Sequence, residues 1–141
     1  RHEKRRRYNV IGLDTNVLVR FLVQDDPVQS RIAAGTFDQL TQADPGFVSR
    51  EVLIELVWVL ERAYDYKRSE IAAALDGLLS AAELEIEAAD DVGPALEFYR
   101  ANGFGFADLM IVAASRRSGA AELLTFDRKA AQLPGVRLLT A

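Results

Sequence analysis

Four acidic residues are placed where they could do chemistry: Asp14, Glu55, Asp108 and Asp127. Asp14 and Asp127 each come at the end of a short apolar run, and Asp108 lies near the start of an expected helix. Each aspartate could instead cap a helix, which is worth about 1 kcal/mol. Glu55 is flanked in sequence by apolar residues, and an unpaired buried carboxylate costs several kcal/mol. The apolar surroundings of Glu55 in the sequence therefore favour a functional role for it, unless an ion pair with Arg50 or Arg62 stabilises its charge.

These acids would do metal-dependent chemistry if they met in one pocket. Converging carboxylates repel one another, and their pKa values rise unless a cation lies among them. Mg²⁺ and Mn²⁺ are hard ions that prefer oxygen ligands and keep several waters. A metal held in this way suits phosphodiester hydrolysis, because the ion lowers the pKa of an attacking water and offsets charge on the phosphate. The acids therefore predict Mg²⁺ as the cofactor, with Mn²⁺ as a substitute.

The residues that the chain lacks exclude most other catalytic chemistry. There is no cysteine, and His2 is the single histidine. Disulfides, thiolate catalysis, Cys/His zinc sites and an imidazole base within the fold are therefore excluded. Catalysis would have to use carboxylates, hydroxyls, amides, lysine, arginine or tyrosine.

The elements that must position these acids alternate between strand and helix. Apolar runs predict strands at residues 10–13, 47–48, 84–86, 122–125 and 136–139. Helical spacing and capping residues predict six helices. The first starts at Asp14 or Thr15, the second covers 27–42, and the third follows Ser49 and extends to residue 60. The last three cover 69–82, Asp90 or Asp91 to 102, and 106–118, and a helical turn is expected at 127–133. This alternation indicates an α/β domain with a mainly parallel sheet, whose active site lies at the carboxyl ends of the strands.

Four sequence segments, in order, resemble the motifs of PIN-domain ribonucleases. They are Ile11-Gly12-Leu13-Asp14-Thr15-Asn16-Val17-Leu18, Ser49 to Leu56 with Glu55, Phe106-Ala107-Asp108-Leu109-Met110-Ile111, and Leu124-Thr125-Phe126-Asp127. Their order, their spacing and the chain length are similar to the VapC toxins of toxin–antitoxin pairs. The resemblance covers residues 8–141. It implies a three-layer α/β/α fold around a parallel sheet of four or five strands, an acidic Mg²⁺ site and endonucleolytic cleavage of specific RNA, such as tRNA or rRNA.

The resemblance also implies a role for each site residue. Asp14 and Asp108 would be the principal metal ligands, and Glu55 and Asp127 would complete the acidic quartet by binding metal directly or through water. Asn16 would hold the first aspartate or a metal-bound water, and Thr125 would do the same from the last motif. Both of these residues also suit a turn at a strand end.

The resemblance further implies protein partners. VapC-like toxins are held inactive by a cognate antitoxin that covers the acidic groove and can insert an arginine, and they commonly form homodimers and toxin–antitoxin hetero-oligomers. Dimer contacts could come from the apolar face around Val17, Phe21 and Leu22 or from the helix at Ile71–Leu79, although both could equally be core.

Charge is unevenly distributed along the chain of 141 residues, a length that suits one domain. Residues 1–7 form a basic tail, interpreted as an added sequence, a processed end, a disordered segment or a genuine extension. Residues 8–141, the PIN-like domain, have 12 basic and 20 acidic residues, a net charge of −8. Such a domain suits recognition of one RNA shape better than indiscriminate binding. The candidate phosphate contacts are Arg116, Arg117, Arg128 and Lys129, which could also be solvated surface charges.

The apolar stretch at 10–23 is interrupted by Asp14 and Arg20, which excludes a signal sequence or membrane span there and favours a cytoplasmic location without membrane association.

This sequence lacks residues that two rival enzyme classes require. A haloacid-dehalogenase-type phosphatase needs a second aspartate two residues after the first, where Asn16 stands. A response-regulator receiver needs an acid pair after strand one, a phosphoacceptor and a late lysine, and no such set is correctly placed. A catalytically silent PIN-like domain that only binds protein or RNA remains the alternative.

Overall fold

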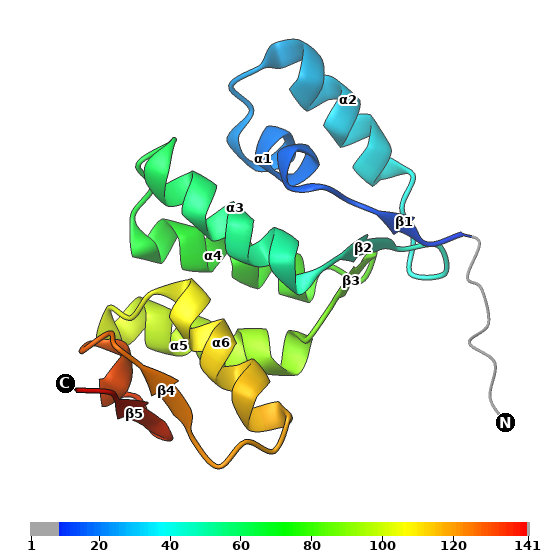
Figure 1. Cartoon of the computed structure of the whole chain (residues 1–141). Helices are drawn as coiled ribbons and strands as arrows, with labels where there is room; N and C mark the ends of the chain where they lie inside the picture. Colours follow the sequence, from blue (N-terminus) through cyan, green and yellow to red (C-terminus); the bar gives the residue numbers. More distant parts are fainter. Residues whose placement is uncertain (1–8, 141) are drawn as a thin grey trace, which may run out of the picture.

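The computed structural model describes residues 9–140, so the predicted basic tail at 1–7 lies outside the described residues. Residues 9–140 form six α-helices, one 3₁₀ turn and five short strands (Figure 1). The helices are α1 (Thr15–Val23), α2 (Pro27–Asp38), α3 (Arg50–Arg62), α4 (Arg68–Ser80), α5 (Ala89–Asn102) and α6 (Phe106–Arg117). The strands are β1 (Ile11–Gly12), β2 (Gly46–Val48), β3 (Leu84–Ile86), β4 (Leu123–Thr125) and β5 (Val136–Leu138), with the 3₁₀ turn η1 (Ala130–Gln132) between the last two.

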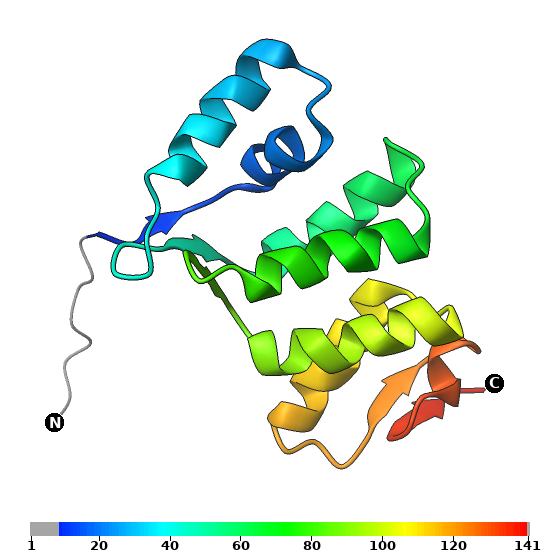
Figure 2. The same cartoon turned by 180° about the vertical axis from the view of Figure 1, so that it is seen from behind.

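All strand pairs in the described residues are parallel, which confirms the predicted α/β class. β2 lies between β1 and β3 in one sheet, and β4 pairs with β5 in a second sheet. The five expected strands are thus divided between two sheets instead of forming a single one. The reason is the path of α5 and α6, which pack on each other after β3 and carry the chain away from β1. Figures 1 and 2 show β4 and β5 at the opposite end of the molecule from β1.

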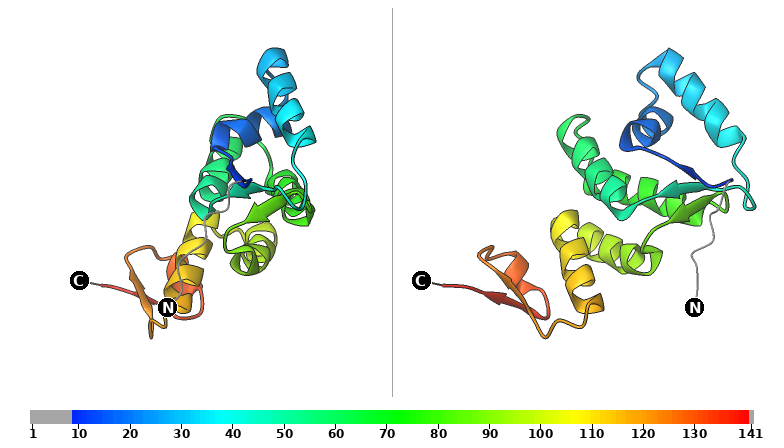
Figure 3. Two further views of the ribbon diagram at one scale, coloured as in Figure 1. Left: turned by 90° about the vertical axis from the view of Figure 1, so that its right-hand side faces the viewer. Right: turned by 45° about the vertical axis from the view of Figure 1, so that its right-hand side comes forward.

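The helices form a series in space that begins at α2 and passes through α1, α3 and α4 to α5 and α6 (Figure 3). α1 packs on α2 and α3, α4 packs on α3 and α5, and α5 packs on α6. The core between them includes Leu18, Leu53, Leu56, Leu60, Leu75, Leu96, Tyr99 and Met110. Both candidate dimer faces contribute to this packing. Phe21 stacks on Phe37 with 4.0 Å between ring centroids, and Ile71 is fully buried.

Capping side chains mark the starts of α2 and α3 as predicted. The Asp26 carboxylate accepts a hydrogen bond from the Gln29 amide at 3.0 Å, and the Ser49 hydroxyl accepts one from the Val52 amide at 3.1 Å. α2 ends at Asp38, four residues before the predicted end at residue 42. α5 begins at Ala89 because Ala88 takes the left-handed conformation at φ 58°. The predicted start at Asp90 or Asp91 is therefore wrong, and both acids lie in the first turn instead.

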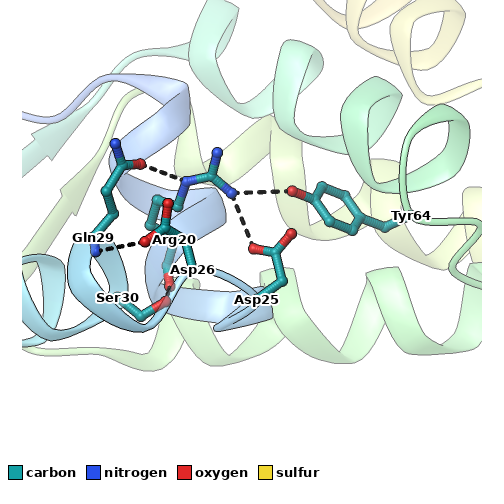
Figure 4. Close-up of polar contacts among 6 residues, drawn as sticks. All are labelled: Arg20, Asp25, Asp26, Gln29, Ser30 and Tyr64. Carbon is teal, nitrogen blue, oxygen red and sulfur yellow. Dashed lines mark hydrogen bonds and ion pairs between the residues drawn. The ribbon is translucent and has the colours of Figure 1, made fainter.

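A polar cluster around Arg20 holds α1 in place against α2 and the end of α3 (Figure 4). The Arg20 guanidinium donates to Gln29 Oε1 at 2.7 Å, to Asp25 Oδ1 at 3.0 Å and to the Tyr64 hydroxyl at 3.2 Å. Because α1 begins directly after Asp14, this cluster also fixes the direction in which the chain leaves that acid.

No helix within residues 9–140 combines the length and the apolar character needed to cross a membrane.

Candidate active site

Asp14 joins the end of β1 to the start of α1 and is exposed. Its position is pinned by the preceding residue, since the Leu13 amide donates to the Phe47 carbonyl at 2.9 Å. Asp14 is the N-cap residue of α1, yet within the described residues its carboxylate accepts no capping hydrogen bond. Capping therefore does not occupy this side chain, and its oxygens are available to a ligand.

Glu55 is exposed on α3, so the expectation that it is stranded among apolar neighbours is wrong. Residues next to it in sequence, including Leu56 and Val57, point into the core from other faces of the helix. Glu55 instead shares an exposed stripe with Glu51, Trp58 and Arg62, spaced by three or four residues.

The partner of Glu55 is a hydroxyl, not an arginine. Thr15, the first residue of α1, donates a hydrogen bond from Oγ1 to Glu55 Oε1. Arg50 donates to the Met110 carbonyl at 2.8 Å, and the Arg62 guanidinium lies 5.9 Å from the centre of the Trp58 ring. Neither arginine forms an ion pair with Glu55 in the described part of the chain, which removes the structural explanation considered for this acid.

Asp108 lies half-buried in the first turn of α6. A Cβ atom on Gly105, the N-cap residue, would lie only 3.2 Å from Asp108 Oδ2. Glycine at this position therefore leaves room for the carboxylate. Burial raises the pKa of Asp108 above its ordinary value, and repulsion from the Asp127 carboxylate raises it further.

Asp127 follows β4 and is held by the turn that it organises. Its Oδ1 atom accepts hydrogen bonds from the Lys129 amide at 2.8 Å and the Ala130 amide at 3.0 Å. The Thr125 hydroxyl accepts one from the Asp127 amide at 3.0 Å. Asp127 thus caps the turn through one oxygen, and Thr125 steadies its backbone. The second oxygen makes no hydrogen bond within residues 9–140.

The structure does not bring the four acids together in one group. Asp108 and Asp127 lie close enough to repel each other, and the Thr15 hydroxyl ties Glu55 to the segment that follows Asp14. Within residues 9–140, no three acidic side chains are grouped so that they could hold one metal ion. The expected meeting of all four around one pocket is absent here because β4, which precedes Asp127, does not lie beside β1.

The Asp108–Asp127 pair is the part of this arrangement that fits a magnesium ion. Mg²⁺ commonly binds through one or two carboxylates and fills its remaining positions with water. The Asp108 and Asp127 carboxylates repel each other, and Asp108 is partly desolvated. A bound cation would reduce this repulsion. Neither Asp14 nor Glu55 is grouped with Asp108 and Asp127 in this structure.

Three of the four candidate phosphate contacts have partners within the chain. Arg117 binds both carboxylate oxygens of Asp91, at 2.9 and 2.6 Å, and Arg116 donates to the Pro134 carbonyl at 2.9 Å. The Lys129 ammonium lies 5.3 Å from the centre of the Phe104 ring. Arg128 is exposed and, among residues 9–140, has neither an ion pair nor a hydrogen bond.

Asn16 is exposed, and its side chain makes no hydrogen bond within the described residues. The polar residue that does contact the acidic site from this motif is its neighbour Thr15. Sequence reasoning considered Thr15 only as a helix cap, because a bond between residues 40 positions apart has no local signature.

A groove of about 460 Å³ runs beside Glu55 between α3 and the start of α6. Ile54, Trp58 and Phe106 give it an apolar lining, and Glu51 and Glu61 add negative charge. Trp58 is 57% exposed although it is the single tryptophan of the chain. Trp58 follows Glu55 by three residues, which places both on one face of the helix. This spacing is the sequence signal that could have identified Trp58 as a neighbour of Glu55.

Comparisons with known proteins show which family this sequence matches. The sequence model of the PIN domain family matches residues 11–136. A VapC ribonuclease of Aquifex aeolicus (strain VF5) is 29% identical over 118 residues, which are 83% of this chain and 87% of that protein.

A solved structure of Mycobacterium tuberculosis VapC20, described as a Sarcin-Ricin loop cleaving toxin, aligns with 92% of this chain and 98% of its own. Its sequence identity is 20% and its TM-score is 0.43. The family assignment rests on the sequence match, which spans the strand-end acids, Glu55 and Asp108. The chain belongs to the PIN domain family.

Proposed function

We propose that this chain is a Mg²⁺-dependent endoribonuclease and the toxin component of a toxin–antitoxin pair. The observation that carries the proposal is the match of residues 11–136 to the PIN domain family, in a chain where the Asp108 and Asp127 carboxylates repel each other and no histidine or cysteine lies within the described residues. Similarity to a VapC ribonuclease over most of both chains supports RNA as the substrate.

Each acid has a role in this proposal. Asp108 and Asp127 hold the ion, with the Asp127 carboxylate fixed by the Lys129 and Ala130 amides. Asp14 and Glu55 complete the acidic site, and the Thr15 hydroxyl binds Glu55. Asn16 supports Asp14, and Thr125 supports the Asp127 turn. When bound, Mg²⁺ would polarise a phosphate oxygen and lower the pKa of a water, which is the chemistry that phosphodiester hydrolysis requires.

The substrate in this proposal is a particular structured RNA, such as a tRNA or an rRNA hairpin. A net charge of −8 from Tyr8 onward gives little general attraction for a polyanion. Arg117 is paired with the Asp91 carboxylate, whereas Arg116 contacts a neutral carbonyl and Lys129 an aromatic ring, so Arg116, Arg128 and Lys129 keep charges that could meet phosphate. Recognition would then depend mainly on RNA shape and unpaired bases.

The protein partner in this proposal is a cognate antitoxin. The groove beside Glu55 combines an apolar lining from Ile54, Trp58 and Phe106 with the acids Glu51 and Glu61. Such a groove suits a segment with apolar anchors and basic residues. Occupation of this groove would cover Glu55 and inhibit cleavage. We also propose a homodimer; of the two apolar faces named from the sequence, Val17, Phe21 and Leu22 are partly exposed, whereas Ile71 is fully buried.

Incubation of the purified protein with a panel of structured RNAs tests the nuclease function. The panel includes tRNAs, rRNA hairpins and an unstructured RNA of equal length, each with Mg²⁺, Mn²⁺ or EDTA. Discrete fragments are expected from at least one structured RNA with either metal and from none with EDTA, because the acids alone cannot activate water. Intact RNA throughout the panel with metal present, or cleavage that persists in EDTA, would contradict the proposal.

Because no three acids are grouped within residues 9–140, a second candidate is a silent PIN-like domain that only binds protein or RNA. The same panel separates the two candidates. A silent domain would shift the mobility of an RNA on a native gel and release no fragments under any metal condition.

A further inference from the structure

Apart from Tyr99, whose buried hydroxyl donates to Glu61, Thr15 is the one buried polar or charged side chain of residues 9–140, with 3% of its surface exposed. It lies between Leu13 and Leu18, both buried, at the point where the chain enters α1. A buried hydroxyl costs free energy unless it is hydrogen-bonded. The Thr15 hydroxyl meets this need by donating to the Glu55 carboxylate on α3.

The elements on either side of this bond are held rigidly. α1 and α3 pack directly on each other, and Leu18 on α1 and Leu53 and Leu56 on α3 are buried. The donor therefore has a fixed position, whereas the Glu55 side chain is exposed and would otherwise move among rotamers. The bond restricts the carboxylate more than it restricts the threonine.

Stability alone does not account for a threonine at this position. Valine has nearly the same shape and would fill the buried space without a hydroxyl to satisfy. The loss of the hydroxyl would leave no buried group unpaired, because the exposed Glu55 carboxylate can bind water instead. A purely structural role therefore predicts that Thr15→Val is neutral or stabilising and has no effect on function.

We propose that Thr15 is a positioning residue, whose hydroxyl holds the Glu55 carboxylate toward the chain segment that carries Asp14. This inference rests on the proposed nuclease function. It assigns to the first motif a residue that acts through Glu55 and does not itself touch the substrate.

Single-turnover RNA cleavage by Thr15→Val and Thr15→Ser tests the proposal. Removal of a residue that orients an active-site ligand typically costs about 10- to 100-fold in activity, which is the loss expected for Thr15→Val. Thr15→Ser retains the hydroxyl and should restore most of the rate. Thr36→Val is the matched control, because the Thr36 hydroxyl bonds only within its own helix, to the Ile32 carbonyl at 3.2 Å.

The Thr15→Val melting temperature should equal or exceed that of the wild type, so that activity and stability change in different directions. If this variant does not fold, Thr15→Ala replaces it with the same expectations for the rate. In a Glu55→Gln background, Thr15→Val should cause no further loss of rate, because the two residues act as one unit. Wild-type activity in Thr15→Val, failure of serine to rescue, or losses that multiply in the double variant would overturn the proposal.

An NMR measurement tests the contact without catalysis. In protein labelled with ¹³C at the glutamate carboxyl carbons, the Glu55 signal is assigned through its absence in Glu55→Gln. Thr15→Val should shift this signal and Thr36→Val should not. An unshifted signal would refute the Thr15 inference alone, whereas a wild-type protein that cleaves no RNA would refute the nuclease function itself.

Discussion

Asp108→Asn is expected to abolish RNA cleavage while making the protein more stable. The loss of rate should be roughly a hundredfold or more, since even an outer partner of a metal ligand is typically worth about 10- to 100-fold. Asparagine is nearly isosteric with aspartate, so the variant should keep the fold of α6 and the space beside Gly105.

The gain in stability follows from the raised pKa of Asp108, caused first by burial and second by Asp127. The unfolded chain loses the Asp108 proton near the ordinary pKa of 3.8, whereas the folded protein keeps it to higher pH. The free energy of unfolding therefore falls as pH rises through this window, and the loss persists at neutral pH. Asp108→Asn removes this loss of unfolding free energy, because asparagine does not ionise. In EDTA, its unfolding midpoint should exceed that of the wild type at pH 7 and converge with it below pH 3.8.

Asp38→Asn is the matched control for this prediction. Asp38 is exposed at the end of α2 and forms no ion pair or hydrogen bond through its side chain within residues 9–140. The same change of charge there should leave the rate of RNA cleavage unaltered. Full activity in Asp108→Asn would contradict its assignment, and equal stability at neutral pH would contradict the electrostatic account of the Asp108–Asp127 pair.

Arg68→Met is expected to cause a large loss of stability. The Arg68 guanidinium donates to the carbonyls of Tyr99 at 2.9 Å, Phe104 at 2.7 Å and Gly103 at 3.1 Å, and lies 4.3 Å from the centre of the Tyr99 ring. These carbonyls end α5 and lead into α6, where the last carbonyls of a helix lack partners of their own. Because hydrogen bonds to a charged group are worth about 1.5–3 kcal/mol, the free energy of unfolding should fall by about 2–4 kcal/mol.

Arg100→Met provides the comparison, because Arg100 lies at the surface of α5, the helix whose last carbonyls Arg68 binds. Its ion pairs with Asp76 at 2.6 Å and Glu97 at 3.2 Å are exposed, and such pairs contribute at most about 1 kcal/mol. Urea unfolding should therefore separate the two variants clearly. Similar losses of stability in both would show that Arg68 does not fasten the α5–α6 connection. That connection leads directly to Asp108, so Arg68→Met should also lower the rate of RNA cleavage.

The positions of the helices and strands could be predicted because their signals are local. Asp26 with Pro27, and Ser49 before an apolar stretch, mark helix starts within a few residues of sequence. The start of α5 was missed because it depends on the left-handed backbone of Ala88, which alanine adopts uncommonly. The division into two sheets also has no local signal, since it depends on how α5 and α6 pack.

The sequence predicts which acids are candidates for the site, but it does not predict their surroundings. Glu55 attracted attention for a reason that the structure shows to be wrong, because neighbours along a helix point in different directions. The contact with Thr15, and the capture of Arg117 by Asp91, join residues 40 and 26 positions apart. Such pairings arise from tertiary packing, which spacing along one sequence does not encode.

We propose that Asp14 and Glu55 act in one site with Asp108 and Asp127, although no three of these acids are grouped within residues 9–140. Mg²⁺-dependent RNA cleavage by Asp14→Asn tests it most directly, because Asp14 is exposed and caps no helix through its side chain. We expect Asp14→Asn to lose as much of the RNA cleavage rate as Asp108→Asn, with an unchanged melting temperature. An Asp14→Asn variant that cleaves RNA at the wild-type rate would contradict it.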